Sequence, residues 1–276
     1  VANASITSGD VLTGGTSTDD KLTVTADGST VTAAELGGVT GIESIVYATN
    51  ATTGAITLPD TIMAAGKTLT VDGTAITGSN NVLTVVGTAE TDGSLIVKGG
   101  AGNDVITGTA SSLGDNLQGG SGDDTFNFAT ANLTALDVVD GGAGTVDNLV
   151  TTDAGTLIDT DFTGITNVEK LSLNAGTTVT LDTLAQAAGF TTFVTSTGTN
   201  VVTLKAGYTN DFTITLVSAT DSVIGTAYTG SMNVKFGAAV LTSADTITGG
   251  TGTGDVLTIT AGAALTTTDM SKVSKV

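Results

Sequence analysis

The sequence predicts an all-β fold, a β-solenoid of short strands and tight turns with short decorating helices. Three observations predict it: the residue composition, the scarcity of aromatic residues, and the alternation of apolar residues with threonine. Of the 276 residues, 59 are Thr, 38 are Gly, and 23 of the 27 acidic residues are Asp. Threonine favours extended backbone, whereas Asp and Gly favour turns. Aromatic residues form only 4% of the chain, and thin aliphatic interiors suit stacked short strands.

Apolar residues alternate with threonine in several segments, and a period of two is typical of half-buried strands. These predicted strands span 22–25, 68–71, 82–85, 179–181, 212–216 and 256–259.

Two short helices are expected, over Pro59 to Ala65 and over Leu181 to Ala188. Pro59 suits a first helical turn and Asp60 would favour the helix dipole, while Asp182 or Thr183 would open the second helix. Both would decorate turns of the solenoid.

Two loops, 99–106 and 119–126, share the pattern Gly-Gly-x-Gly-x-Asp, then one residue and a large apolar residue. In such a turn glycines permit positive φ, the Asp supplies a hard oxygen ligand, and the apolar residue starts an inward-facing strand. A degenerate third copy spans 141–149. The copies begin at 99, 119 and 141, about two nine-residue turns apart, so the three loops are predicted to stack at one edge and share calcium ions.

Asp104 and Asp124 are the leading candidate ligands. Asp115 is a further candidate, from an eleven-residue version of the turn at 108–118 that carries a two-residue bulge. The full set of candidate metal-binding residues is Gly99, Gly100, Gly102, Asn103, Asp104, Asp115, Gly119, Gly120, Gly122, Asp123, Asp124, Asp140, Gly142, Gly144 and Asp147. The alternative interpretation is a tight turn without an ion. For the related loops at 14–20 and 249–255, a tight turn and a calcium site are equally favoured.

A longer repeat relates Gly14 to Gly141 and Gly249, with Leu22, Leu149 and Leu257 at equivalent places. We expect one elongated solenoid over 1–276, with sub-repeats at about 12–98, 99–149 (the calcium-binding core), 141–248 and an incomplete 249–276. Because the last repeat is incomplete, the chain is expected to be a fragment of a longer one. Glu43 and Glu169 also occupy equivalent places, where a solvent-facing strand position or pairing with a lysine is favoured over an ion ligand.

Composition argues against several functions. A formal net charge of −19 without any Arg argues against nucleic-acid binding and against anionic membranes, and no apolar stretch is long enough to span a membrane. The absence of His, Cys and Arg removes the usual general base, thiolate nucleophile and anion clamp. Paired carboxylates could serve glycoside hydrolysis, but a sugar-binding cleft is unexpected without Trp. We therefore expect no catalytic residues and no enzyme activity.

On the glycine-rich motifs at 99–149, the chain resembles RTX-type calcium-binding repeat proteins, and especially the surface-layer proteins that bacteria export by type I secretion. The resemblance implies a right-handed parallel β-roll or β-helix, folding driven by Ca²⁺ after export, and lateral assembly into a lattice. The bulged turn at 108–118 and the residue inserted before Asp147 depart from the family pattern.

The expected function is structural: a secreted, extracellular cell-surface protein that assembles with itself into a surface layer or filament. An adhesin stalk or binding module is one alternative, and the non-catalytic repeat region of a type I secreted enzyme is another. Self-association is the expected partnership, with cell-surface polysaccharide as a further partner of regions outside this segment.

Overall fold

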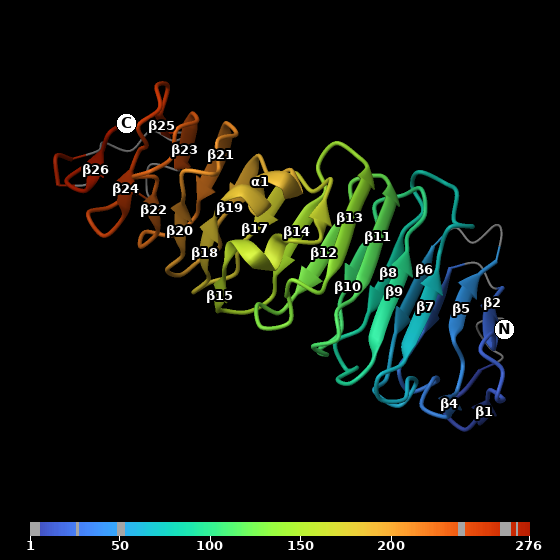
Figure 1. The fold of residues 1–276 in the computed structure, drawn as a ribbon. Coiled ribbons are helices and arrows are strands. Elements are labelled where there is room, and N and C mark those ends of the chain that lie inside the picture. The colour runs from blue at the N-terminus through green and yellow to red at the C-terminus, as the bar shows by residue number, and fades with distance from the viewer. Residues whose placement is uncertain (1–5, 26–27, 49–52, 237–240, 260–265, 269) are drawn as a thin grey trace. The chain divides into compact units, whose positions relative to one another are not determined.

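The chain folds as an all-β parallel solenoid of about 11 turns, which confirms the predicted fold class (Figure 1). The computed structural model describes residues 6–25, 28–48, 53–236, 241–259, 266–268 and 270–276. Neighbouring strands pair in parallel, as in β7 with β9 and β21 with β23. Parallel pairing follows from the solenoid path, because each strand meets its equivalent one turn later.

The elements, in chain order, are β1 (Leu12–Thr13), β2 (Lys21–Val24), β3 (Ser29–Val31), β4 (Val39–Thr40), β5 (Ser44–Tyr47), β6 (Gly54–Thr57), β7 (Thr68–Asp72), β8 (Leu83–Val86), β9 (Ser94–Lys98), β10 (Val105–Thr107), β11 (Asn116–Ser121), β12 (Thr125–Phe128), β13 (Val138–Ala143), β14 (Asn148–Thr151), β15 (Thr156–Leu157), the 3-10 helix η1 (Asp159–Phe162), β16 (Ile165–Thr166), β17 (Lys170–Ser172), β18 (Thr178–Leu181), α1 (Thr183–Ala188), β19 (Thr192–Val194), β20 (Val201–Leu204), β21 (Phe212–Leu216), β22 (Ser222–Ile224), β23 (Met232–Phe236), β24 (Thr246–Thr248), β25 (Val256–Ile259) and β26 (Val273–Ser274).

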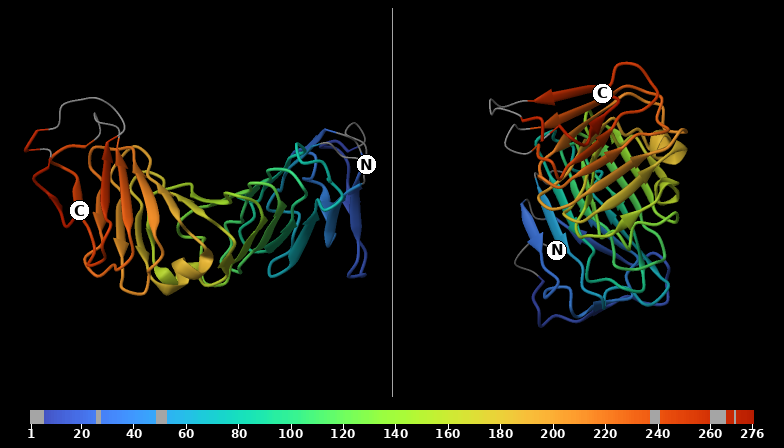
Figure 2. Two further views of the ribbon diagram at one scale, coloured as in Figure 1. Left: turned by 90° about the horizontal axis from the view of Figure 1, so that it is seen from above. Right: turned by 90° about the vertical axis from the view of Figure 1, so that its left-hand side faces the viewer.

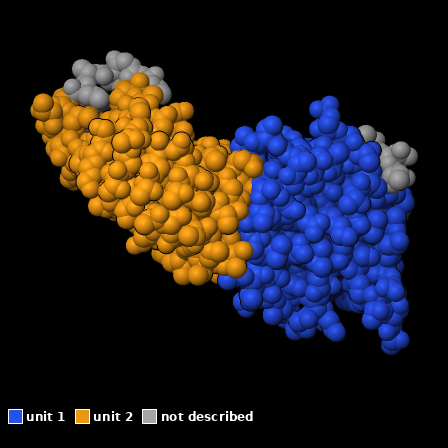
Figure 3. All heavy atoms as spheres, turned by 45° about the horizontal axis from the view of Figure 1, so that its top comes forward, with its two compact units in different colours: residues 1–128, 134–148, 164–167 blue, residues 129–133, 149–163, 168–276 orange. Residues whose placement is uncertain are grey.

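The chain divides into two compact units (Figure 3). Unit 1 comprises residues 1–128, 134–148 and 164–167, and unit 2 comprises 129–133, 149–163 and 168–276. In unit 1, one sheet has the order β16-β13-β11-β9-β7-β5-β2 and a second runs β12-β10-β8-β6-β3. In unit 2, one sheet has the order β15-β18-β20-β22-β24-β26 and a second runs β17-β19-β21-β23-β25. Figure 2 shows these rows of neighbouring strands from two further directions.

The six strands predicted from alternating residues are confirmed, each within one residue at either end. Burial alternates in β2, β7, β8, β18 and β21 as the pattern predicts, because successive side chains of a strand point to opposite faces. In β25 the side chains are exposed or half-buried instead. Leu69 and Val71 of β7 are buried, and they lie in register with the buried Leu95 and Val97 of β9. The core of unit 1 is thus a mainly aliphatic stack of side chains, joined by the buried rings of Tyr47, Phe126 and Phe128.

Aromatic side chains are concentrated in the core of unit 2. The six rings form an unbroken series of contacts, with centroids 5.3 to 6.3 Å apart, through Phe162, Phe190, Phe193, Tyr208, Phe212 and Tyr228. Most of these pairs are edge-to-face, the arrangement that the ring quadrupole favours. Rings that are irregularly spaced in the sequence therefore form one continuous stack along unit 2.

One expected helix is present and the other is not. Helix α1 spans Thr183–Ala188, with Asp182 at its N-cap position and Gly189 at φ +106° after its end. The prediction of a helix over Pro59 to Ala65 is wrong, because this segment consists of turns and bends. The Asp60 carboxylate accepts hydrogen bonds from the Thr91 N–H (3.0 Å) and hydroxyl (2.7 Å), so it connects two turns of the solenoid instead of favouring a helix start.

Candidate metal site

Three glycine-rich loops lie at one edge of unit 1, where β9, β11 and β13 end. Strands β11 and β13 run into the second and third loops and pair Gly120 with Gly142. The Ser121 N–H donates to the Gly100 carbonyl at 3.0 Å, which joins the first loop to the second. The loops that begin at 99, 119 and 141 therefore follow one another in successive turns.

Close stacking of these loops requires glycine independently of any ion. A Cβ atom on Gly99 would overlap the Gly119 carbonyl oxygen, and one on Gly119 would lie 2.6 Å from the Gly141 carbonyl oxygen. Backbone conformation adds a second requirement, since Gly120, Gly122 and Gly142 have φ of +105°, +109° and +95°. The same steric exclusion by a neighbouring turn applies to the remaining loop glycines, which are Gly100, Gly102 and Gly144.

Behind the glycines, three aspartates form a buried column, each about 1% exposed: Asp104, Asp124 and Asp147. Each precedes a strand and accepts a backbone hydrogen bond from the turn before it. Asp104 Oδ1 accepts the Leu83 N–H at 2.7 Å, Asp124 Oδ1 accepts the Asp104 N–H at 2.7 Å, and Asp147 Oδ1 accepts the Asp124 N–H at 2.6 Å. We call this repeating hydrogen-bond pattern the carboxylate ladder.

Asp104 and Asp124 differ at the second carboxylate oxygen. Asp104 Oδ2 accepts the N–H of Gly100, in its own loop, at 2.6 Å. Asp124 Oδ2 is buried and has no hydrogen-bond partner among the described residues. It faces Gly119, where a Cβ would lie 2.1 Å from this oxygen and 2.6 Å from the Gly141 carbonyl oxygen. An unpartnered buried carboxylate oxygen beside a carbonyl oxygen is the hard donor set that Ca²⁺ prefers, so these residues fit that ion.

The electrostatics of the column also favour a cation at Asp124. Burial raises the pKa of Asp104 to about 6, against the opposing effect of N–H groups from Gly100 and Leu83. Burial raises the pKa of Asp124 to about 8, and the charges of Asp104, Asp147 and Asp123 add to the increase. A bound cation would remove this penalty by compensating the carboxylate charge.

A second, exposed column of side chains lies along the same loops. Asn103 Oδ1 accepts the Asp123 N–H at 2.9 Å, and Asp123 Oδ1 accepts the Thr145 N–H at 2.7 Å. The N–H groups of Thr145 and Val146 lower the pKa of Asp123. Asp140, in β13, instead accepts a 2.7 Å hydrogen bond from the Asn167 side chain. These hydrogen bonds give Asn103, Asp123 and Asp140 defined structural roles at the surface.

Asp115 lies at the opposite edge of unit 1, in the loop between β10 and β11. Its Oδ1 accepts the Leu95 N–H at 2.8 Å, and its Oδ2 accepts the Thr109 N–H at 2.7 Å. Burial raises its pKa. The structure thus separates Asp115 from the other candidate ligands and places it in a carboxylate ladder of its own. The eleven-residue version of the turn is a corner loop at this second edge.

Sequence reasoning missed further aspartates that repeat this hydrogen-bond pattern elsewhere in the fold. Asp137 Oδ1 accepts the Asp115 N–H at 2.8 Å in unit 1, and Asp245 Oδ1 accepts the Asp221 N–H at 2.9 Å in unit 2. A local signal marks them: Thr134, three residues before Asp137, donates its N–H to that carboxylate at 2.7 Å. Thr242 and Asp245 repeat the spacing and the 2.7 Å bond. A Thr three residues before an Asp that precedes a strand is therefore the pattern that could have found these residues.

The degenerate loops at 14–20 and 249–255 follow the same local geometry. Asp20 Oδ2 accepts the Gly15 N–H at 2.7 Å, and Asp255 Oδ2 accepts the Gly250 N–H at 2.8 Å. Glu43 accepts the Asp20 N–H at 2.8 Å. In each loop a backbone amide already occupies the carboxylate oxygen that faces the glycines.

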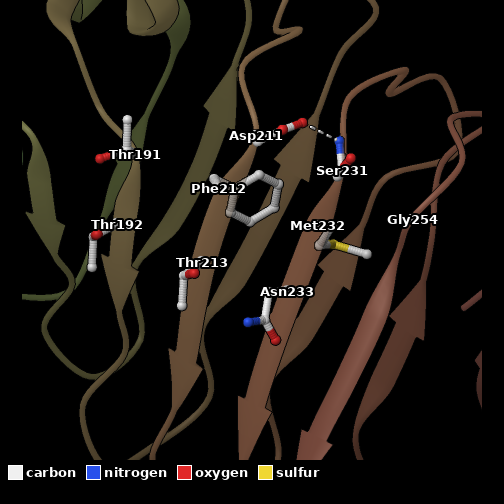
Figure 4. A pocket seen from close by; sticks show the side chains of 9 residues that line it. All are labelled: Thr191, Thr192, Asp211, Phe212, Thr213, Ser231, Met232, Asn233 and Gly254. Atoms are coloured by element: carbon white, nitrogen blue, oxygen red, sulfur yellow. Dashed lines mark hydrogen bonds between the residues drawn. The ribbon is translucent and has the colours of Figure 1, made fainter.

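Unit 2 contains a shallow groove of about 420 Å³ across the starts of β19, β21 and β23 (Figure 4). Thr192, Thr213 and Asn233 line it from adjacent strands. Asp211 is the only acidic residue in its lining, and its Oδ1 accepts the Ser231 N–H at 2.7 Å. This lining lacks the carboxylate pair that glycoside hydrolysis requires.

Three further findings bear on function. Within the described part of the chain, no group of three or more His, Cys, Asp or Glu side chains is placed to hold a metal ion. In the same residues, no helix has the length and apolar character needed to cross a membrane. Comparisons with protein-family models, curated proteins and solved structures found no match to this chain.

Proposed function

We propose that this protein is a calcium-stabilised structural protein of the bacterial cell surface, secreted by a type I system and assembled with itself into a layer or filament. The observation that supports the proposal most is the unpartnered Oδ2 of Asp124, buried between stacked glycine-rich loops. Carbonyl oxygens of the neighbouring glycines and this carboxylate would hold Ca²⁺. The ion would supply charge compensation and a connection between adjacent turns.

Charge explains why calcium would control folding and assembly. At a net charge of −19 the chain repels both itself and other copies, and the repulsion opposes compact packing. Ions bound between turns would reduce that repulsion and couple binding to folding, because the unfolded chain offers no preformed site. A protein of this kind would pass through a secretion channel unfolded and fold in the calcium-rich exterior.

The experiment compares the purified chain in excess chelator, in millimolar Ca²⁺ and in millimolar Mg²⁺. Circular dichroism should show more β-structure or a higher melting temperature in Ca²⁺, and electron microscopy should show ordered sheets or filaments. Mg²⁺ is the matched control for ionic strength and charge, since it demands a tighter octahedral geometry. Identical spectra and melting temperatures in all three conditions, with calcium removal verified, would refute calcium dependence.

A second candidate is an adhesin stalk, favoured by the repetitive stacking of about 11 turns, which suits a spacer between functional regions. Persistent monomers with a calcium-raised melting temperature would favour a stalk, or the non-catalytic repeat region of a secreted enzyme, over a lattice protein. The groove of unit 2 gives no support to catalysis by this segment, because its lining has a single acidic residue.

A further inference from the structure

The two loops with the same Gly-Gly-x-Gly-x-Asp pattern are not equivalent in the folded protein. In the first loop, Gly100 follows the end of β9 and its N–H donates to Asp104 Oδ2 at 2.6 Å. In the second loop, Gly120 lies inside β11 at φ +105° and pairs with Gly142. Asp124 Oδ2 receives no corresponding hydrogen bond.

This difference determines how each loop satisfies a buried carboxylate. A buried charge is costly unless it is paired or hydrogen-bonded. At Asp104 two backbone amides meet this requirement, one on each oxygen. At Asp124 one backbone amide donates to Oδ1, and no group among the described residues donates to Oδ2.

We propose that the glycine-rich edge holds one cation, bound at Asp124 Oδ2 between the loops at 119–124 and 141–147, and that the loop at 99–104 folds without an ion because the Gly100 amide takes the cation's place. The proposal rests on the calcium-binding function proposed above and narrows it to one carboxylate. It also extends to the degenerate loops, where the Gly15 and Gly250 amides occupy the corresponding oxygens of Asp20 and Asp255.

Replacing each Asp by Asn has different consequences under this proposal. Asp104→Asn places an NH₂ group against one of two N–H donors, so it should lower the melting temperature equally in Ca²⁺ and in chelator. Asp124→Asn can keep its single hydrogen bond through Oδ1, so it should leave the melting temperature in chelator close to that of the wild type. It should abolish the increase that Ca²⁺ causes in the wild type.

The experiment measures melting temperatures of the full chain and its variants in excess chelator and in about 5 mM Ca²⁺. This concentration is sufficient for a site of about millimolar affinity or better. Isothermal titration of the wild type with CaCl₂ should give one ion at this edge, and Asp124→Asn should lower the stoichiometry by one. Asp115→Asn, at the opposite edge, is the matched control: like Asp104→Asn, it should lose stability but keep the full calcium response.

The outcomes separate this proposal from the proposed function. A calcium response that survives Asp124→Asn, or one that Asp104→Asn abolishes, would overturn the one-cation assignment while leaving calcium dependence intact. No calcium response in the wild type would overturn both. If Asp104→Asn does not fold, the stoichiometry of the wild type and of Asp124→Asn still decides, because sharing of ions by both loops predicts more than one.

Discussion

Substituting Gly99 by Ala tests whether close stacking of the loops, rather than ion binding alone, explains the glycines. The added Cβ would overlap the Gly119 carbonyl oxygen and lie 2.5 Å from Asp104 Oδ2. To relieve this overlap the first loop must move away from the second. The movement would break the 2.8 Å bond from the Gly99 N–H to the Gln118 carbonyl and the 2.6 Å bond from the Gly100 N–H to Asp104.

The magnitude follows from these two bonds. Each hydrogen bond contributes about 1 kcal/mol, and a buried carboxylate oxygen left without its donor costs about 1 to 3 kcal/mol more. We therefore expect Gly99→Ala to lower the free energy of unfolding by about 3 to 5 kcal/mol. The loss should appear in chelator as well as in Ca²⁺.

The assay is urea unfolding followed by far-ultraviolet circular dichroism, in chelator. Gly9→Ala is the matched control, because a Cβ at Gly9 would meet only the Thr7 hydroxyl at 4.0 Å and its φ is not in the left-handed region. The control should unfold within about 0.5 kcal/mol of the wild type. If Gly99→Ala were as stable as Gly9→Ala in chelator, the steric explanation of the loop glycines would be refuted.

Two further predictions concern the core and the buried acids. Phe193→Ala should lower the free energy of unfolding by about 3 to 5 kcal/mol, because the ring is fully buried and contacts three other rings. Urea unfolding monitored by tyrosine fluorescence would measure this loss. A loss below about 1 kcal/mol would contradict the observed packing of the ring. Acid should stabilise the calcium-free protein through Asp104 and Asp137, whose pKa values burial raises. A carboxyl group whose pKa is raised in the folded state stabilises the fold fully when the pH is below its ordinary pKa of about 4. This stabilisation is lost as the pH rises through the folded-state pKa, which is about 6 for Asp104. Urea midpoints in chelator should therefore fall between pH 4 and pH 7, with Asp104 contributing about 3 kcal/mol, and midpoints that rise over this range would contradict the assignment.

The strands were predictable because their signal is local. Phe212 to Leu216 alternates apolar residues with Thr, and the structure has a strand over the same residues, with Phe212, Ile214 and Leu216 buried. The spacing of 20 and 22 between glycine pairs likewise gave the stacking of the three loops, since that distance is set by the length of a solenoid turn. Both predictions used spacings between residues that recur along the sequence.

The hydrogen-bond partners of the carboxylates could not be predicted in this way. Asp124 accepts its hydrogen bond from the N–H of Asp104, which lies 20 residues earlier in the chain. This pairing depends on the register of β10 with β12. The shared Gly-Gly-x-Gly-x-Asp pattern does not distinguish Asp104 from Asp124 either. The difference arises because β11 continues through Gly120, whereas β9 ends at Lys98, before the first glycine pair.

The predicted helix at Pro59 failed for a related reason. Its capping signals are genuine as local chemistry, but the Asp60 carboxylate is used by Thr91 from another turn. In a solenoid every corner has a neighbour within one strand spacing, about 4.8 Å away, so side chains that would cap a helix in isolation find partners across the stack. Tertiary contacts of this kind override weak local preferences.

The carboxylate ladder changes how the acidity of this chain should be interpreted. A net charge of −19 suggests acids that repel one another until cations arrive. Asp104, Asp115 and Asp137 are nevertheless buried, and backbone N–H groups donate hydrogen bonds to both carboxylate oxygens of each. Asp in this fold is thus a corner residue first, which joins its own loop to the preceding turn. A glycine-rich motif ending in Asp therefore predicts a solenoid corner, and under our proposal we expect an ion only where the local backbone leaves a carboxylate oxygen without an amide.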